Sequence, residues 1–531
     1  MGLHATRFGN WIVDDAGITF AYARSVAEGY GPVLQPGAAP TEGYSDPTWL
    51  ALLSIGRLVG LFDRGAIFGV PDYVLFPKAL ALLCCAGILL TCYGVATKVS
   101  QRPALVTFVI GAILAAVPSF VIWCFSGLEN SLYALIVTAL GATMFRATID
   151  NRLLTTRTAL LAGTLAALAA LTRPDGLIYA AAYPLVVLVQ IRRPTARRGA
   201  RAVAVAAGAF LVIFGVYLTW RYLEFGRLTS LPTIAKGQAP PDTTTLGRAS
   251  DLLQYIGALP GIVLAVLIGM TMVRPSVLRG AMISFLVPLV LAVVAYSVLE
   301  PDWMGQFRFA TPVWPLVAIV GVLCGTAAFR HVGVRGLVVL SAALVVAAIP
   351  VWGLFSGYSN SFRAAPTTPL CWVAERPSRA DNAYADILGV RQSSLLTADV
   401  GGTALTSRLR IVDLDGLTDS KMAGFWADQN WAALDNYVFD VAKPTFIELH
   451  PPWGDLTGVN TDPRLVRDYT LIRVDDADNT DWVRTSDVLS TGRLTQARDY
   501  ATTDVTRTKD NAAAAPLREC GATLRPGQWP N

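Results

Sequence analysis

Long apolar runs, separated by short charged breaks, fill the chain between residues 73 and 354. A membrane-spanning helix needs about 20 mostly apolar residues, within a range of roughly 17–25. The runs therefore predict about ten spans, two of them short and joined by a tight hairpin at 172–175. The predicted spans are 73–96, 104–123, 129–146, 158–171, 176–191, 202–222, 255–273, 280–299, 310–329 and 336–354.

Residues 355–531 have a different pattern, rich in Asp, Thr and Arg. Short segments with strand character at 395–400, 409–414, 444–449 and 469–474, with a helix near 419–437, predict a small soluble α/β unit. The composition changes near Ser356. The sequence thus predicts a polytopic α-helical membrane protein with three regions: a first outer segment (1–72), a transmembrane domain (73–354) and a C-terminal soluble α/β domain (355–531).

One apolar stretch near the N-terminus does not fit the spans. Residues 48–61, TWLALLSIGRLVGL, have a helical pattern but are too short to cross a membrane comfortably, and Arg57 interrupts them. We expect an amphipathic helix lying at the membrane surface. Residues 1–13 are too short and too polar to span, so the first predicted span begins at Tyr73.

Composition supports a membrane protein. The chain is 53% hydrophobic and 15% charged, with a mean hydropathy of +0.47, whereas a soluble domain carries about 25% charged residues. The net charge of +5 comes mostly from short loops between apolar runs. We find no clustered basic and aromatic surface of the kind that nucleic-acid binding requires, so no nucleic-acid partner is expected.

The basic loops set the orientation. Lysine and arginine are enriched in cytoplasmic loops, and alternate loops here carry fourteen basic residues against five. The larger group consists of Lys98, Arg102, Arg146, Arg152, Arg157, Arg192, Arg193, Arg197, Arg198, Arg201, Arg274, Arg279, Arg330 and Arg335; the smaller of Arg173, Arg227, Lys236, Arg248 and Arg308. We therefore place the larger group in the cytoplasm, and 1–72 and 355–531 outside it.

Two of the seven cysteines, Cys371 and Cys520, lie in the soluble domain and bracket it. If that domain faces an oxidising compartment, they are candidates for a disulfide. The alternative is a pair of buried free thiols. The other five cysteines lie in or beside apolar runs and are expected to be packing residues.

An acidic pair, Asp14-Asp15, stands at the start of the outer segment. Adjacent like charges raise one another's pKa, so that one of the two could accept a proton near neutral pH. The alternative is a helix N-cap before AGITFAYARSVAEG. Glu42 and Tyr44, in TEGYSDPTW, lie further along the same segment.

Three more polar clusters fall on the same predicted side. Glu129 lies in SGLEN, and Arg173 lies beside Asp175 in TRPDG; a structural ion pair is an equally good interpretation of each. Asp302, Trp303 and Arg308 lie in EPDWMGQFRF. A guanidinium at Arg308 could bind a phosphate bidentately, and Lys236 could join it. Together these residues predict an outward-facing pocket for a lipid phosphate, in which cations hold the leaving phosphate and a carboxylate deprotonates an attacking hydroxyl.

The soluble domain offers weaker signals. Gly401-Gly402 follows a predicted strand, but this is too little for a nucleotide-binding loop. Asp399, Asp413, Asp415 and Asp419 could bind a sugar or a metal, although turn and cap roles are expected first.

Six blocks, in order, resemble a known superfamily. The run DDAGITFAYARSVAEGYGPVLQPGAAPTEGYSDPTWLALL resembles the first outer loop of bacterial GT-C glycosyltransferases. SGLENSLYALIV, LTRPDGLIY, EFGRLTSLPTIAKG, DWMGQFRFATPVWP and IVDLDGLTDSKMA resemble further blocks of the subgroup of mycobacterial and other actinobacterial terminal arabinofuranosyltransferases. The resemblance covers most of residues 11–450. In that family a transmembrane helix directly precedes the acidic pair, whereas only MGLHATRFGNWIV precedes it here.

The resemblance implies an activity and roles for residues. The family transfers sugars from polyprenyl phosphate to acceptors at the outer membrane face, usually with inversion, and takes the catalytic base from the first outer loop, which corresponds to Asp14 or Asp15. Lys236 and Arg308 lie in the blocks that bind the carrier phosphate, and Arg173 is a further candidate. Some members need a divalent metal and others do not, so the metal stays open. The soluble domain is expected to dock the glycan acceptor.

The resemblance therefore implies a plasma-membrane glycosyltransferase acting in cell-wall biogenesis, with arabinofuranose as the sugar. Glu42, Tyr44, Glu129, Asp302 and Trp303 are expected in its substrate pocket. One alternative is a non-enzymatic transporter of lipid-linked sugars, which should have inverted repeats; the sequence has none that we find. Another is an envelope scaffold that displays the soluble domain.

Overall fold

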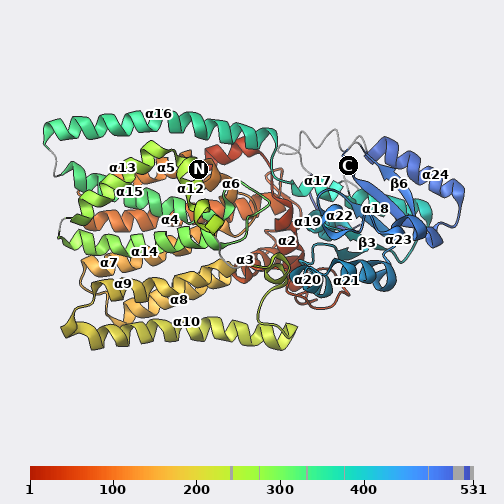
Figure 1. Cartoon of the computed structure of the whole chain (residues 1–531), viewed down its shortest axis with the longest axis horizontal. Helices are drawn as coiled ribbons and strands as arrows, with labels where there is room; N and C mark the ends of the chain where they lie inside the picture. The colour runs from red at the N-terminus through yellow and green to blue at the C-terminus, as the bar shows by residue number, and fades with distance from the viewer. Residues whose placement is uncertain are drawn as a thin grey trace. The chain divides into compact units, whose positions relative to one another are not determined.

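The computed structural model describes residues 1–238, 243–273, 275–330, 333–375, 377–475, 477–505 and 520–526. Arg274, one of the predicted cytoplasmic charges, lies outside them. The chain divides into two compact units (Figure 1). The helical unit comprises 1–7, 78–220 and 238–364, and the mixed unit comprises 8–77, 221–237 and 365–531.

Six helices in the described part of the chain are long and apolar enough to cross a membrane, and two bent helix pairs raise the number to eight. The six spans lie in α4 (Asp72–Val99), α7 (Asn130–Ile149), α10 (Ala196–Phe225), α14 (Val277–Val298), α15 (Val313–Phe329) and α16 (Val334–Ala364). Figure 1 shows α10 and α16 at opposite edges of the helical unit. Their apolar windows are only 17% and 11% buried, which leaves apolar side chains for lipid to cover. The polytopic helical fold is confirmed.

The remaining predicted spans are helical but interrupted or short. Residues 104–123 form α5 (Pro103–Ala116) and α6 (Pro118–Cys124), bent by 83°, because Pro118 lacks an N–H and disfavours a helical conformation at Val117. Helices α12 (Thr243–Ile256) and α13 (Ala258–Val273) meet at a 100° bend. Helices α8 (Thr156–Thr172), η2 (Pro174–Ala181) and α9 (Ala182–Gln190) reproduce the predicted break at 172–175. Helix α16 continues through Ser356, so the composition change falls inside a helix.

The mixed unit contains a five-stranded sheet of order β4-β3-β5-β7-β6. Strands β3 (Ser394–Thr397), β4 (Arg410–Asp413) and β5 (Phe446–Leu449) are parallel, whereas β7 (Thr480–Arg484) pairs antiparallel with β5 and β6 (Tyr469–Val474). One face packs on α18 (Pro377–Leu388) and α24 (Thr491–Tyr500) through side chains such as Tyr384 and Ala497. The other packs on α20 (Ser420–Ala427), α21 (Trp431–Asn436), α22 (Trp453–Thr457) and α23 (Pro463–Asp468). Four predicted strands are confirmed, and β7 is additional.

The first outer segment folds with this sheet domain, in the same unit. Helix α2 (Asp14–Ala27) packs on α19 (Val400–Thr406), and a Cβ on Gly17 would lie 2.6 Å from the backbone carbon of Gly401. The Trp11 indole N–H donates to the Thr367 carbonyl at 2.8 Å. Helix α3 (Pro47–Leu58) covers the stretch predicted to lie at a membrane surface; that location stays a prediction. Helix α11 (Leu231–Lys236) packs against α20.

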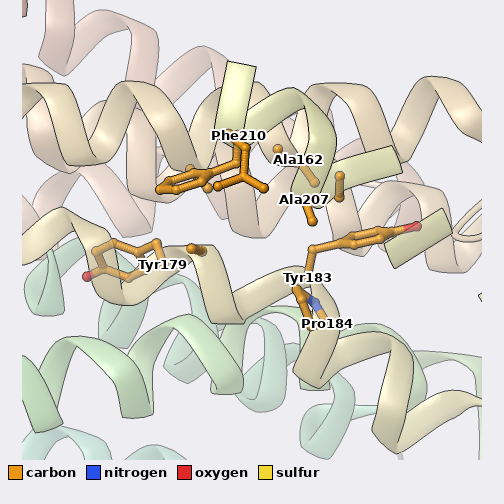
Figure 2. A pocket seen from close by; sticks show the side chains of 11 residues that line it. Ala162, Tyr179, Tyr183, Pro184, Ala207 and Phe210 are labelled. Atoms are coloured by element: carbon orange, nitrogen blue, oxygen red, sulfur yellow. The ribbon is translucent and has the colours of Figure 1, made fainter. Parts of the chain in front are cut away.

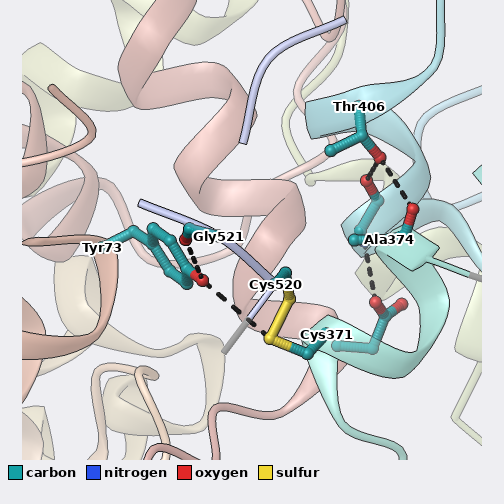
Figure 3. The surroundings of a disulfide bond; sticks show 8 residues. Tyr73, Cys371, Ala374, Thr406, Cys520 and Gly521 are labelled. Carbon is teal, nitrogen blue, oxygen red and sulfur yellow. Dashed lines mark hydrogen bonds between the residues drawn. A yellow bond between two sulfur atoms is a disulfide. The ribbon is translucent and has the colours of Figure 1, made fainter. Parts of the chain in front are cut away.

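A disulfide joins Cys371, in α17 (Leu370–Glu375), to Cys520, with the Cα atoms 5.1 Å apart (Figure 3). The Tyr73 hydroxyl donates to the Gly521 carbonyl beside it, at 3.1 Å. This is the pair that the sequence singled out, and it attaches the described end of the chain to the part of the mixed unit that contacts α2.

Candidate functional site

The two acids of the predicted pair, Asp14 and Asp15, differ in burial. Asp14 is the first residue of α2, yet its side chain does not cap that helix. Its Oδ2 and Oδ1 instead accept the backbone N–H groups of Gly401 and Gly402 at 3.0 and 2.7 Å. Asp14 is 5% exposed, whereas Asp15 is only partly buried. The interpretation of Asp14 as the cap of its own helix is therefore wrong, because its carboxylate accepts N–H groups at the start of α19 instead.

The carboxyl of Asp14 is also in an unusual electrostatic environment. Burial raises its pKa well above the ordinary value, and the charges of Asp399 and Asp15 act in the same direction. The two glycine N–H groups oppose this by stabilising the carboxylate. The acidic pair therefore lies within the electrostatic reach of a soluble-domain carboxylate, that of Asp399.

Asp399 directly precedes α19 and faces a histidine. The His450 Nε2 lies 3.4 Å from a carboxylate oxygen of Asp399. Burial disfavours the imidazolium, but the hydrogen bond and charge of Asp399, with the charge of Glu448, raise the pKa of His450 to about 10. His450 is therefore a cation at neutral pH. Burial and the charges of Asp413, Asp399 and Asp15 raise the pKa of Asp415, while His450 lowers it.

Two of the soluble-domain acids have the structural roles expected for them. Asp413 accepts backbone N–H groups from Asp415, Gly416 and Thr418 at 2.9, 3.1 and 2.6 Å, which shapes the turn after β4. Burial raises the pKa of Asp413 to about 7. Asp419 caps α20 by accepting N–H groups from Lys421 and Met422.

The structure gives no support for a metal in these clusters. Within the described ranges, no group of three or more His, Cys, Asp or Glu side chains is arranged to hold a metal ion. Asp14 accepts two glycine amides, Asp413 shapes its turn, and one oxygen of Asp399 lies against His450. One oxygen each of Asp399 and Asp415 is buried and accepts no hydrogen bond from the described residues. We derive no step through a metal.

The predicted pocket residue Glu42 is held by an arginine that the sequence analysis assigned to a span. Glu42 is 3% exposed, and its oxygens lie 2.7 Å from Nε and 2.9 Å from Nη2 of Arg221. Its backbone carbonyl accepts the N–H of Leu231 at 3.0 Å. Arg221 could have been found as the only charge inside the apolar run 202–222, where a charge needs a partner.

The other two predicted residues of this unit differ in exposure. Tyr44 is buried, and its ring packs edge-on against Tyr22 with the centroids 5.1 Å apart. Lys236 ends α11 and is exposed. Its ammonium makes no hydrogen bond or ion pair with the residues that the structure describes, so it can accept an anion without first breaking a contact.

In the helical unit, two arginines share one aromatic ring. Arg173 pairs with Glu129 at 2.8 Å and with Asp175 at 2.9 Å. Its guanidinium carbon lies 4.8 Å from the centroid of Phe309, and that of Arg308 lies 4.9 Å from the same centroid. Arg173 is 6% and Arg308 is 8% exposed. Ring faces attract guanidinium groups, so Phe309 holds the two cations in one place.

Arg308 has fewer charged partners than Arg173. Its Nε lies 2.6 Å from a carboxylate oxygen of Asp302, and its Nη1 faces the Met304 sulfur at 3.2 Å. Asn130 supports the backbone of Arg308 by donating from Nδ2 to its carbonyl at 3.2 Å. The structure thus brings Glu129 to Arg173 and Asp302 to Arg308. Trp303 is 48% exposed and stays at the surface.

An apolar groove of about 170 Å³ lies between α8, the η2–α9 segment and α10 (Figure 2). Ala162, Tyr179, Tyr183, Ala207 and Phe210 are among its lining residues. Its narrowness follows from Gly163, where a Cβ would lie 2.1 Å from the Ala206 carbonyl oxygen. The groove can accommodate an aliphatic chain, but none of its lining residues carries a charge.

No protein-family model and no curated protein sequence matches the chain. The chain is similar to solved structures of ArnT from Cupriavidus metallidurans. The apo form has a TM-score of 0.59 at 13% identity, covering 92% of this chain and 97% of that one. The form bound to undecaprenyl phosphate has a TM-score of 0.55 at 13% identity, covering 92% and 96%. The Archaeoglobus fulgidus oligosaccharyltransferase in complex with Zn and sulfate has a TM-score of 0.51 at 11% identity, covering 94% and 76%. These likenesses show that the chain shares the fold of these two proteins.

Proposed function

We propose that the protein is a membrane glycosyltransferase that moves a sugar from a polyprenyl-phosphate donor to a cell-envelope glycan or lipid acceptor. The single observation that carries the proposal is the acidic pair at the start of α2, in a chain that shares the fold of ArnT. ArnT has been solved bound to undecaprenyl phosphate, and a lipid carrier of this chemistry suits a chain with several membrane-crossing helices.

The chemistry needs a base and a means to hold a leaving phosphate. A carboxylate of the pair Asp14–Asp15 takes the proton of an acceptor hydroxyl, whose oxygen attacks the anomeric carbon. The bond from that carbon to the phosphate oxygen breaks, and polyprenyl phosphate leaves from the opposite face, with inversion. Hydrogen-bond donors aimed at the phosphate stabilise the charge that develops there.

Three cations are candidates to bind the phosphate, and they differ in exposure and in the number of their carboxylate partners. Lys236 is exposed. Arg308 has one carboxylate partner, whereas Arg173 has two. We therefore propose Arg308 as the candidate phosphate ligand of the helical unit, with Arg173 as the residue that holds Phe309 beside it. Lys236 is the candidate of the mixed unit.

The sugar and the compartment are further parts of the proposal. The resemblance to terminal arabinofuranosyltransferases favours arabinofuranose as the sugar and cell-wall glycan as the acceptor. The excess of basic residues in alternate loops favours a plasma-membrane protein whose mixed unit faces outward. The disulfide in that unit supports this orientation, because disulfides persist in oxidising compartments.

Depletion of the protein in its host, followed by mass spectrometry of lipid extracts, tests the proposal. We expect one polyprenyl-phosphate sugar to accumulate, with a mass increment that identifies the sugar, and a cell-wall glycan to lose the same sugar. An unchanged pool of lipid-linked sugars would contradict the transferase. Accumulation at the inner leaflet alone would favour a transporter.

A further inference from the structure

Helix α3 has apolar side chains on two faces. One face lies in the core of the mixed unit, where Trp49 and Leu53 are 1% and 0% exposed. The other carries Ile55 and Leu58, followed by Val59, and these side chains are 56%, 64% and 63% exposed. The outer face of a helix in a water-soluble unit is normally polar, and a helix that is apolar on both faces is covered by protein or by lipid. The outer face of α3 is therefore a candidate contact for lipid.

A two-stranded hairpin next to α3 presents a further apolar side chain. Strands β1 (Ala66–Ile67) and β2 (Val70–Pro71) are joined by Phe68 and Gly69. Both of these turn residues have a positive φ, 53° and 77°, a conformation for which tight hairpins prefer Asn-Gly. Phenylalanine is an unfavourable residue for this backbone conformation, and the Phe68 side chain is 98% exposed. The turn thus presents an aromatic ring that is not packed against protein, at a cost in backbone strain.

Both features are joined to the first turns of α4, a helix long and apolar enough to span a membrane. Oδ2 of Asp72, the first residue of α4, accepts the N–H groups of Arg64 and Gly65 at 2.8 Å each, which attaches the base of the hairpin. A Cβ on Gly56 of α3 would collide with the ring of Phe76. The C-terminal end of α3 therefore lies against α4 about one turn beyond Asp72.

The length of α4 gives the depth of these features in a bilayer. Its 28 residues correspond to a length of about 42 Å, and a bilayer is about 40–45 Å thick including its headgroups. A bilayer that α4 crosses therefore has headgroups at the level of the first turns of this helix. The hairpin and the end of α3 lie beside those turns.

We propose that five exposed apolar side chains form a membrane anchor, which inserts at the boundary between the headgroups and the acyl chains of the leaflet where α4 begins. The anchor consists of Ile55, Leu58, Val59, Leu61 and Phe68. Apolar faces at this depth are stabilised by burial in lipid. The inference does not depend on the proposed function, because it concerns the surface that the mixed unit presents to lipid and not the reaction.

The anchor is connected to the helix that carries the acidic pair. The ring of Phe20, in α2, packs edge-on against Phe62 with the centroids 5.0 Å apart, and Phe62 lies 5.7 Å from Phe76 of α4. Arg24, also in α2, pairs with Asp63 at 2.7 Å. Through these contacts the anchor holds α2 at a fixed depth relative to the lipid headgroups. A lipid-linked substrate would present its phosphate at that level.

Site-directed spin labelling of the full-length protein in liposomes of phosphatidylcholine and phosphatidylglycerol tests the anchor. Nitroxides are attached to Leu58→Cys, to Phe68→Cys and, as the control, to Leu489→Cys, which replaces a 78% exposed apolar side chain of the same unit. The free cysteines of the described residues are buried, so the protein without an introduced cysteine serves as the labelling blank. Power saturation then compares how often each nitroxide collides with oxygen, which concentrates in lipid, and with a water-soluble nickel chelate.

We expect the labels of Leu58→Cys and Phe68→Cys to collide more with oxygen than with the nickel chelate, and the label of Leu489→Cys to show the reverse. All three variants should keep the Tm of the wild type, because the replaced side chains are exposed. Nickel access in Leu58→Cys and Phe68→Cys equal to that in Leu489→Cys would overturn the anchor. Protection from both reagents would also overturn it, because protein and not lipid would then cover the surface.

Discussion

Arg173 and Arg308, which are 135 positions apart in the chain, place their guanidinium groups 4.8 and 4.9 Å from the centroid of one ring, that of Phe309. Their carboxylate partners differ: Glu129 and Asp175 bind Arg173, and Asp302 binds Arg308. Two cations with the same aromatic contact therefore have different capacities for a further anion.

We expect replacement of Arg308 to weaken donor binding and replacement of Arg173 to lower stability. Arg308→Gln should raise the KM for the lipid-linked donor about 10- to 100-fold, the size of a lost hydrogen bond to a charged group. Arg173→Gln should instead lower the free energy of unfolding by about 3–5 kcal/mol. Glu129 would lose its ion-pair partner, and Asp175 would keep the hydrogen bond from the Tyr133 hydroxyl but lose its charged partner. Donor titrations and thermal melts separate the two effects. Arg279→Gln, an exposed arginine at the predicted cytoplasmic side, is the control, and identical behaviour of all three variants would contradict this division.

The ion pair of Glu42 and Arg221 can be tested by exchange. The two side chains are 2% and 11% exposed and make two short contacts. We expect Glu42→Gln to lower the free energy of unfolding by about 3 kcal/mol, and the swap Glu42→Arg/Arg221→Glu to recover part of it. Thermal melts of the single and double variants measure this. If Glu42 instead acts on the substrate, Glu42→Gln will keep the wild-type Tm and lose activity.

The stability of the mixed unit should fall as pH rises. His450 has a pKa of about 10 in the folded protein and about 6.5 in the unfolded chain. The contribution of His450 to the free energy of unfolding is therefore complete below pH 6.5 and is lost as the pH rises through 10. This contribution is on the order of a few kcal/mol. The pKa of Asp413 is raised to about 7 in the folded protein, so the protonated carboxyl stabilises the folded state. This contribution to the free energy of unfolding is lost as the pH rises from about 4 to 7. Tm measured from pH 6 to pH 10 should fall more steeply in the wild type than in His450→Gln; parallel curves would count against the pairing with Asp399.

The disulfide should stabilise the mixed unit through the length of chain that it closes. Cys371 and Cys520 are 149 residues apart, and a loop of that size corresponds to about 5 kcal/mol in the chain-entropy account. Cys371→Ser/Cys520→Ser should therefore melt at a lower temperature than the wild type. Dithiothreitol should lower the Tm of the wild type and leave the double variant unchanged. An equal effect of the reductant on both proteins would show that the bond is absent in the folded protein.

Periodicity and composition predict the helices and strands of this fold better than the bends between helices and the pairing of strands. Every predicted apolar run is mostly helical in the described residues, in one helix or in two consecutive ones, because burial or lipid exposure of about 20 residues leaves a strong signal. The bend at Val117–Pro118 was not predicted, because the apolar run 104–123 indicates a single span, although Pro118 accounts for the break. Strand β7 was missed because its five residues, TDWVR, are short and half polar. It becomes a strand because β5 and β6 pair with it on both sides.

The site shows the same limit. The acidic pair and the cations were visible as charges beside apolar runs, but their partners were not. The Gly401-Gly402 dipeptide was too weak a signal for any ligand loop, and its role as the donor to Asp14 depends on a contact spanning 387 positions. Arg221 lies inside a predicted span, so it was not identified as a partner of Glu42. Nothing in the sequence distinguished Phe309 from the apolar residues around it.

The central claim is that the acidic pair supplies the base for transfer from a lipid-linked sugar. It is tested most directly by measuring sugar transfer from a polyprenyl-phosphate donor in proteoliposomes containing the wild type or Asp14→Asn/Asp15→Asn at matched folded concentrations. The account predicts transfer with inversion by the wild type and a rate at least 100-fold lower for the double variant. A folded double variant that transfers the sugar at the wild-type rate would contradict it.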